Sequence, residues 1–366
     1  MALSRISYKQ LESKMDSRKL LIIAPYQFGE LSDCYYWAKY ATLRGVRTTY
    51  IGYKYKSRKI KERAYPGVKT IGVPHLNNKL ILGLSFYLVC ILEILFQHHV
   101  NIIICRMPHC ELLSRVFPRR NVILDVRTLS VSPDEKVRTA QNQHLIDIKG
   151  LFKTCTVISD GVGKAIGGPY KLLPLGAEPL SASEKEFGAL RLFYIGTFNG
   201  RNLPVFIKGI ARYQNHYGKR CTFDVVGGGN SEEERNIHDV IESSGVSGVT
   251  LHGYLNHDEA VPLFERCNVG VCFVPITAYY QFQPPTKLYE YLLSGMACIA
   301  TDTIANAGVI CDKNGIIIKD DEESVEEGLL EIDKRLTSYN SKSIVESSMP
   351  YHWDNIVKES LLPLLQ

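Results

Sequence analysis

The stretch from 279 to 302, YYQFQPPTKLYEYLLSGMACIATD, decides the fold of this 366-residue chain. Its two consecutive prolines end whatever precedes them, and Thr286 is placed to cap a helix that begins at Lys287. Apolar residues at helical spacing follow, and Gly295 ends the helix. The next residues, 296–300, form a short apolar run of the kind that is buried on both faces of a parallel sheet. The stretch therefore predicts a loop, a helix and a buried strand.

The start of this helix is predicted to bind an anion. The first amide groups of a helix have no partner within the helix, and they attract negative charge. Lys287 lies beside these amides, and Glu290 lies about one turn further on. A cation and a carboxylate so close to one helix end suit a ligand that carries both phosphate and hydroxyl groups, as a nucleotide sugar does.

Outside this stretch, short apolar runs alternate with helical segments along the whole chain. Such alternation predicts an α/β fold, with parallel sheets covered by helices on both faces. The pattern lapses at 171–190, where Pro, Gly, Ser and charged residues indicate a linker. We therefore expect two doubly wound, Rossmann-like domains, 1–178 and 179–345, with a cleft between the carboxyl ends of their sheets. The predicted strands are KLLIIA, VRTTYIGY, VKTIGV, NIIIC, NVILDV and CTVIS, then RLFYIG, CTFDVVGGG, VTLHGY, VGVCFVP and ACIATD.

Composition limits the class of protein. With 45% hydrophobic and 22% charged residues, the chain is typical of a globular protein, and its net charge of +5 is too small to indicate nucleic acid. The polar start lacks the apolar centre of a signal peptide. Most of the ten cysteines lie in apolar runs, which favours reduced core thiols and a cytoplasmic protein without structural zinc.

Two stretches raise the question of a membrane. Residues 80–96, LILGLSFYLVCILEILF, are short for a span, so we expect a helix packed in the first domain. The alternative is a helix that lies on a membrane surface. A basic run interleaved with tyrosines suits either a solvated loop or contact with anionic lipid or a phosphorylated acceptor. Its cations are Lys54, Lys56, Arg58, Lys59, Lys61 and Arg63.

Three glycines follow predicted strands, namely Gly29, Gly196 and Gly227. As a set they would let the backbone approach a ligand closely, although each one alone is more often a tight turn. The chain contains no G-x-x-x-x-G-K-[ST] motif, no Ser-His-Asp set and no metal-ligand spacing, so it offers no sign of a Walker-type nucleotidase, a triad hydrolase or a metal site.

Several charged or polar residues stand near predicted strand ends. Arg201 follows RLFYIGT, where a guanidinium is able to hold two phosphate oxygens, and Lys287 adds a second positive charge. Asp125 and Arg127 end the strand NVILDV; they suit equally a ligand-bridging pair and a structural pair that orders the next loop. His109 is a candidate sugar contact, although lone histidines are usually structural.

At this point the residues resemble a known family. The chain resembles the GT-B glycosyltransferases, specifically glycosyltransferase family 4 of bacterial polysaccharide and lipid-linked glycan synthesis. The likeness covers nearly the whole chain, and PPTKLYEYLLSG is its most specific part. It rests on ILDVRTLSV, TVISDGVGK, LLPLGAE, YIGTFNGRN, FDVVGGG, VTLHGYLNHDE, PPTKLYEYLLSGMACIATD and YHWDNIV.

The resemblance implies roles for individual residues. Arg201 and Lys287 would hold the donor diphosphate, and Glu290 would bind the ribose hydroxyls. The last residues, 346–366, would form a helix that packs back on the first domain. Other implied donor contacts are Gly29, Gly196, Thr197, Gly227, His252, Gly253, Tyr254, Leu255, Pro285, Thr286 and Leu288, with the base near 252–255. Implied acceptor or sugar contacts are His109, Asp125, Arg127, Gln281 and Gln283.

The chain departs from the family at three places, and at one of these, near 125–128, it has no counterpart of the family's catalytic-loop histidine. Many members carry two glutamates eight residues apart, and here Phe282 stands where the first would be. The usual polar contact with the donor sugar would then be missing or supplied by Gln281 or Gln283. The arginine–lysine pair that many members place after the first strand of the second domain is reduced to Thr197 and Arg201.

The expected function is therefore a hexosyltransferase-like glycosyltransferase. It would move a sugar from a nucleotide-diphosphate donor to a glycan or polyprenyl-linked glycan in bacterial surface polysaccharide synthesis, with retention and with no metal or other cofactor. We expect a cytoplasmic protein and leave open peripheral contact with the inner membrane. The alternatives are a GT-B sugar-nucleotide epimerase or phosphorylase, and a non-catalytic partner subunit that binds a nucleotide sugar.

Overall fold

The computed structural model describes residues 18–55, 63–130, 132, 134–278 and 280–366. These residues form two compact units; one consists of the described residues up to Leu175 together with Trp353–Gln366, and the other of those in Gly176–His352. The divisions predicted from the sequence lie after 178 and 345, and the units of the structure divide after Leu175 and at Trp353. Most of the basic run, 56–62, lies outside the described residues, as does Tyr279 of the opening stretch.

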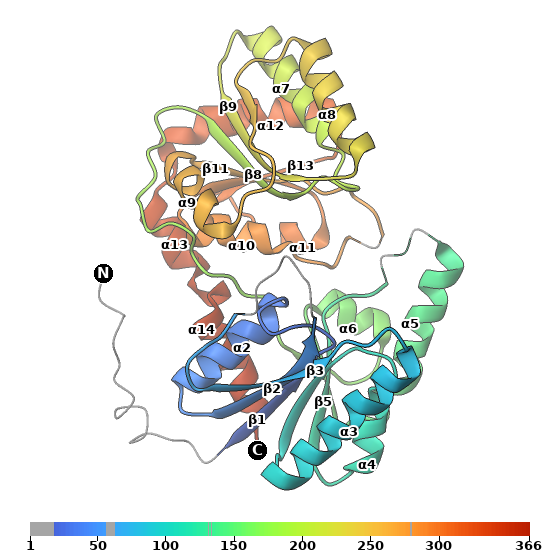
Figure 1. The fold of residues 1–366 in the computed structure, drawn as a ribbon. Helices are drawn as coiled ribbons and strands as arrows, with labels where there is room; N and C mark the ends of the chain where they lie inside the picture. Colours follow the sequence, from blue (N-terminus) through green and yellow to red (C-terminus); the bar gives the residue numbers. More distant parts are fainter. Residues whose placement is uncertain (1–17, 56–62, 131, 133, 279) are drawn as a thin grey trace. The chain divides into compact units, whose positions relative to one another are not determined.

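The first unit is built on a parallel sheet of order β3-β2-β1-β4-β5-β6-β7 (Figure 1). Its central strands are continuous apolar runs, and every residue of β4 and β5 is buried. The strands are β1 (Lys19–Ile23), β2 (Arg47–Lys54), β3 (Val68–Pro74), β4 (Asn101–Cys105), β5 (Asn121–Val126), β6 (Thr154–Val157) and β7 (Lys171–Leu172). The helices between them are α2 (Ser32–Leu43), α3 (Lys79–Gln97), α4 (Glu111–Val116), α5 (Glu135–Lys149) and α6 (Asp160–Ile166).

The end of the chain returns to this first unit. Trp353 is buried and stacks on Tyr36 of α2 with ring centroids 5.6 Å apart. Asp354 pairs with Arg44 at 2.8 Å, so the closing segment is held by charge as well as by apolar packing. The segment consists of α14 (Trp353–Ile356), η3 (Val357–Leu361) and η4 (Leu362–Leu364).

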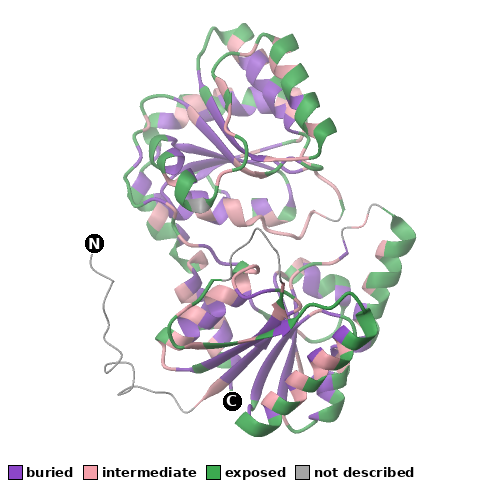
Figure 2. Cartoon of the chain, viewed as in Figure 1, coloured by how far each residue is buried: buried purple, intermediate pink, exposed green. Residues whose placement is uncertain are grey.

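The second unit repeats the architecture with a parallel sheet of order β10-β9-β8-β11-β12-β13. Figure 2 shows the strands of both sheets buried beneath their helices. The strands are β8 (Arg191–Thr197), β9 (Thr222–Gly228), β10 (Val249–Leu251), β11 (Val269–Cys272), β12 (Ala297–Thr301) and β13 (Gly315–Ile318). The helices are α7 (Leu203–Tyr217), α8 (Ser231–Ser244), α9 (His257–Arg266), α10 (Thr286–Leu293), α11 (Ile304–Ala307), α12 (Glu322–Arg335) and α13 (Ser341–Ser348), followed by a short turn, η2 (Met349–Tyr351).

The prediction of two doubly wound domains is confirmed. In each sheet the strand order reverses beside the first strand of the unit, at β1/β4 and at β8/β11. Open parallel sheets bind ligands outside the carboxyl ends of strands at such a switch point. The strands β7 and β13 were not predicted; β7 has only two residues, and β13 is the short run GIII.

Candidate active site

Two glycines leave the backbone bare at neighbouring strand ends of the second unit. Gly196 of β8 and Gly227 of β9 are register partners. Their φ angles, 146° and 143°, lie in the region that favours glycine. A Cβ atom on Gly227 would collide with the carbonyl oxygen of Gly196. Glycine is therefore required at position 227, where the two strand ends pack closely against each other.

The ammonium group of Lys287 lies beside Gly196. Its Nζ atom is 3.6 Å from the centroid of the Tyr194 ring, and it would lie 3.2 Å from a Cβ atom on Gly196. The stem of the side chain is partly accessible, but Nζ is buried and has no hydrogen-bond partner among the described residues. Burial is the main cause that lowers the pKa of Lys287 to about 7, and the charge of Arg201 contributes to the same shift.

Arg201 supplies a second cation to the same region. Its guanidinium lies over the Tyr280 ring, 4.7 Å from the centroid. One nitrogen, Nη1, is buried and has no partner in the described part of the chain. Buried polar groups are nearly always hydrogen-bonded, and two buried cations repel each other. The arrangement therefore suits an anionic ligand.

The first turn of α10 adds amide groups to these cations. The residue that precedes the helix is Pro285, which makes no side-chain cap, and Thr286 is already the first helical residue. The prediction that Thr286 caps the helix is therefore wrong, because the proline takes the cap position. The first amides of an uncapped helix are left for a ligand or for water. Leu288 is fully buried and anchors this turn in the core.

Glu290 stands one turn beyond Lys287 on α10 and is half-buried. Its charge raises the pKa of Lys287, against the larger effect of burial, so the two side chains share one electrostatic environment. In the described part of the chain, no three His, Cys, Asp or Glu side chains come together as a metal site would require. The contact of Glu290 with a ribose stays a prediction.

His252 belongs to a structural ion-pair cluster. Its Nε2 atom lies 2.7 Å from Asp224 Oδ1, and Arg266 also donates to this oxygen. Burial opposes the charge on Asp224, but these two hydrogen bonds outweigh burial and lower the pKa of Asp224. The Gly253 carbonyl accepts a hydrogen bond from Gly227 N at 2.8 Å, which brings the loop to the bare end of β9. Tyr254 is 84% exposed and Leu255 is half-buried, so this loop is open to a ligand.

Gln281 is engaged elsewhere than at a sugar. Its Oε1 atom accepts a hydrogen bond from Ile304 N at 3.0 Å, and its carbonyl accepts one from Ala305 N at 2.9 Å. The residue thus holds the start of α11. Gln283 and Thr197 remain candidates for a polar contact; Gln283 is half-buried, and Thr197 is exposed at the end of β8.

In the first unit, Asp125 and Arg127 form an internal charge cluster. Arg127 donates from Nε to Asp33 at 2.7 Å and from Nη1 to the Leu173 carbonyl at 2.5 Å. Asp125 lies 3.8 Å from Arg127 Nη1 and accepts a hydrogen bond from Thr156 at 2.8 Å. Burial raises the pKa of Asp125 to about 6 although Arg127 acts in the opposite direction. The structural alternative is thus the one that these contacts support.

The other two residues predicted in the first unit lie on its switch-point loops. His109 is exposed, with a φ of 61°, in the turn between β4 and α4. Gly29 has a φ of 89°, and a Cβ atom there would collide with the side chain of Arg63. The side chain of Arg63 is thus a close neighbour of Gly29.

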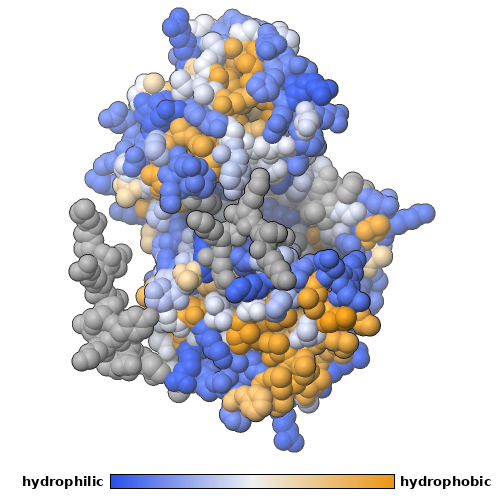
Figure 3. Space-filling model, viewed as in Figure 1, coloured by the Kyte–Doolittle hydropathy of each residue, from blue (hydrophilic) through white to orange (hydrophobic). Residues whose placement is uncertain are grey.

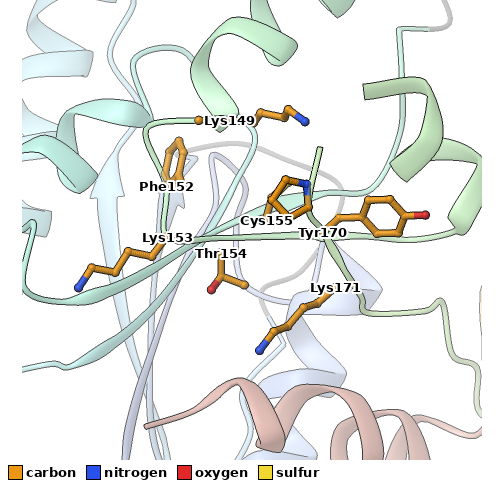
Figure 4. Close-up of a pocket in the computed structure, with 9 residues that line it drawn as sticks. Lys149, Phe152, Lys153, Thr154, Cys155, Tyr170 and Lys171 are labelled. Atoms are coloured by element: carbon orange, nitrogen blue, oxygen red, sulfur yellow. The ribbon is translucent and has the colours of Figure 1, made fainter. Parts of the chain in front are cut away.

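A pocket of about 300 Å³ opens in the first unit at the amino ends of β6 and β7, away from the carboxyl ends where the switch-point loops lie (Figure 4). Three lysines line it, Lys149, Lys153 and Lys171. In Figure 4 the side chain of Lys149 points away from those of the other two, so the ammonium groups do not converge on one ligand. The pocket therefore does not form part of the candidate site.

Sequence reasoning missed three residues of these clusters. Tyr194 and Tyr280 provide the rings on which the two cations lie, and Asp33 is the partner of Arg127. Tyr194 belongs to an apolar strand and looks like a core residue from the sequence. Tyr280 lies before the two prolines and outside the predicted helix, so no sequence pattern pointed to it.

Comparisons with known proteins match the second unit to a family of transferases. Residues 189–333 match the model of the family Glycosyl transferases group 1, and they make up most of the second unit. No curated protein sequence matches the chain.

Solved structures share the fold over nearly the whole chain. Sucrose-phosphate synthase from Thermosynechococcus elongatus is 15% identical with a TM-score of 0.69, covering 93% of this chain and 97% of its own. HepE from Anabaena, solved with UDP and glucose, is 12% identical with a TM-score of 0.69 and coverage of 93% and 98%. WaaG, a glycosyltransferase involved in lipopolysaccharide biosynthesis, is 15% identical with a TM-score of 0.63 and coverage of 93% and 98%. The chain therefore has the GT-B fold, and residues 189–333 of its second unit match the family Glycosyl transferases group 1.

Proposed function

We propose that the chain transfers a sugar from a nucleotide-diphosphate donor to a glycan or lipid-linked glycan acceptor of bacterial surface polysaccharide synthesis. The observation that carries this proposal is the pair of cations Lys287 and Arg201 near the ends of β8 and β9; each has a buried nitrogen without a hydrogen-bond partner among the described residues. A diphosphate would satisfy both cations and the first amides of α10. The structure of HepE with UDP and glucose supports a nucleotide sugar as the donor.

In the proposed reaction, the bond between the anomeric carbon and the diphosphate oxygen breaks while a bond to the acceptor hydroxyl oxygen forms. The hydroxyl proton leaves with the nucleotide, and negative charge builds on the diphosphate. Lys287, Arg201 and the α10 amides would stabilise that charge; fixed donors of this kind are usually the largest single contribution to catalysis. Their two positive charges make a metal unnecessary in this proposal, and no cofactor besides the donor takes part.

The donor-binding roles follow from position. Glu290 would bind the ribose hydroxyls one turn beyond the phosphates, and the loop 252–255 would receive the base at the end of β9. The acceptor would be a glycan, because the similar structures include WaaG and a lipopolysaccharide outer core galactosyltransferase, WaaB. Retention of anomeric configuration is the expected stereochemistry. A cytoplasmic location fits nine free cysteines that are buried and the tenth that is exposed and unpaired.

A thermal-shift panel tests the proposal. The panel contains UDP, GDP, ADP and dTDP together with their common sugars. At a hundred times its dissociation constant, the cognate donor should stabilise the chain by about 2.7 kcal/mol. The matched control is Lys287→Met, in which the same ligand should give a much smaller shift. If no nucleotide diphosphate shifts the wild type, the proposal fails.

Turnover assays then distinguish sugar transfer from the other candidate functions. With a glycan acceptor, NMR of the product shows whether the anomeric configuration is retained. Release of an epimer or of free sugar without an acceptor would instead identify an epimerase or phosphorylase. Donor binding without turnover over a broad acceptor panel would identify a nucleotide-sugar-binding partner subunit.

A further inference from the structure

Helix α3 presents an apolar face to solvent. Leu80, Leu84 and Leu88 are 72%, 65% and 56% exposed, and Phe96 near the end of the helix is 74% exposed. Ile81, Leu92 and Leu95 extend the same surface. Figure 3 shows apolar side chains gathered over the region of α3 and α4. Large contiguous apolar surfaces of this kind mark interaction sites.

The fold does not require this outward face to be apolar. The opposite face of α3 packs inward through Leu82, Phe86, Cys90 and Ile94, each four residues from the next. A surface helix needs only one such stripe, and its outer face is normally charged or polar. The outer leucines of α3 therefore contribute little to the core of the first unit.

Charge on this surface is of one sign. The carboxylate of Glu93 is only 10% exposed and is paired with Lys69 at 2.8 Å. Glu111 of α4 is half-buried. Lys79 begins α3, and Arg115 and Arg119 are exposed on α4 and the turn that follows it, with no ion-pair partner among the described residues. The apolar face is thus bordered by cations, and neither helix offers an exposed carboxylate.

The two helices form one surface. The hydroxyl of Tyr87 on α3 donates to the carbonyl of Pro108, just before α4, at 2.5 Å. Leu112 and Val116 of α4 are 42% and 52% exposed, so α4 adds apolar side chains next to its arginines. We call this surface the α3–α4 face; it consists of the outward residues of Lys79–Gln97 together with Leu112, Arg115, Val116 and Arg119.

From these observations we infer that the α3–α4 face docks on an anionic lipid bilayer, with α3 lying in the plane of the interface. Leucine and phenylalanine on one side, bordered by lysine and arginine, are typical of interfacial helices. The inference deepens the proposed function and rests on it, because docking would hold the chain at the surface where a lipid-linked acceptor lies.

Other occupants fit the face less well. A symmetric dimer would bring the same face of two copies together, and the cations at its border would then face cations without carboxylates to pair with them. By length and composition, α3 is the one described helix apolar enough to cross a membrane. A crossing would remove its inner face from the sheet, however, whereas surface docking leaves the fold intact.

Vesicle cosedimentation tests the inference with the full chain and without any donor. Vesicles of phosphatidylcholine alone are compared with vesicles that also contain phosphatidylglycerol. The wild type should pellet with the anionic vesicles. Replacing the three exposed leucines together, Leu80→Gln, Leu84→Gln and Leu88→Gln, should weaken binding by at least about tenfold, because apolar insertion is lost. Arg115→Gln with Arg119→Gln should weaken binding to anionic vesicles by about fivefold per arginine.

Matched controls keep the test specific. Leu43→Gln, Val137→Gln and Tyr217→Gln replace apolar residues that are 38%, 42% and 43% exposed on other helices, and binding should not change. Lys313→Gln with Lys334→Gln serves as the control for charge. Equal binding by the wild type and the leucine variant would overturn the inference. So would a chain that ignores vesicles but forms dimers that the leucine variant dissociates.

These results are independent of the proposed function. Nucleotide binding in the thermal-shift panel should be the same for the wild type and for the leucine variant. A chain that binds the donor but no vesicles refutes only the docking surface, and a chain that binds vesicles but no donor refutes only the proposed function.

Discussion

Arg127 in the first unit and Arg201 in the second occupy similar positions but have different surroundings. Each follows the carboxyl end of a parallel strand, and each lies over an aromatic ring, Trp37 at 5.2 Å and Tyr280 at 4.7 Å. Arg127 is held by Asp33 and by a backbone carbonyl. Arg201 has no ion-pair carboxylate among the described residues, and its buried neighbour is another cation, Lys287.

The difference separates a structural charge from a binding charge. A buried ion pair whose partners are both present has its charge compensated within the fold. Two cations that face each other repel, and Glu290 offsets only part of the cost of burying Lys287, so a bound anion would lower the free energy of this region. The position at a strand end is common to both arginines, so position alone did not distinguish them.

The largest expected effect would come from breaking the first-unit cluster. Arg127→Met leaves Asp125 and Asp33 without their cation, and removing one partner of a buried pair typically costs about 3 kcal/mol or more. Both tryptophans of the chain, Trp37 and Trp353, belong to the first unit, so their fluorescence reports its unfolding alone. The urea midpoint of this signal should fall strongly at pH 8. An unchanged midpoint would show that Arg127 is not structural.

The same substitution in the second unit is the control. Arg201→Met removes a cation that has no carboxylate to leave behind, so the tryptophan transition should not move. Donor affinity should fall instead.

The next prediction concerns Lys287→Met in the second unit. The variant keeps the length of the side chain and removes a buried charge that lacks a partner. Turnover should fall by about a hundredfold or more, since removing one such stabilising donor has effects of this size. Stability without ligand should stay the same or rise, because an uncompensated buried charge is unfavourable. Intact transfer, or a loss of stability with normal transfer, would contradict the assignment of Lys287 to the leaving diphosphate.

The smallest expected effect is the uptake of a proton when the donor binds. In the free protein, burial lowers the pKa of Lys287 to about 7, and a bound diphosphate would raise the pKa again by favouring the ammonium. At pH 8 the donor should therefore bind with uptake of most of one proton, and at pH 6 with almost none. Calorimetry in two buffers of different ionisation enthalpy measures this, with Lys287→Met as the reference. Equal apparent enthalpies at pH 8 would count against the prediction.

The same shift predicts a direction for stability. The pKa of Lys287 is lower in the folded chain than in the unfolded chain, so the unfolded chain binds more protons between pH 7 and about 10. The stability of the wild type relative to Lys287→Met should therefore rise with pH across this window.

Much of the fold could be predicted because its strands are local patterns. Continuous apolar runs such as NIIIC and NVILDV predict strands that are buried on both faces. In the structure each of these two runs is a buried strand at the predicted place. The start of α10 was less predictable, because Thr286 and Pro285 both favour a helix start and only the backbone shows which residue caps it. Strand β13, GIII, was too short to distinguish from a loop.

The sequence by itself determined the two doubly wound units, the glycines at the ends of β8 and β9, and the cations that follow β8 and begin α10, because these depend on residue type and local spacing. Only the tertiary structure decided which charges are compensated. Asp33 is 94 residues from Arg127, and Tyr194 is far in sequence from Lys287, so no local pattern joins them. For the stretch 279–302, the sequence predicted a helix start that binds phosphate, and the fold supplied the buried, unpaired ammonium group that gives that prediction its physical basis.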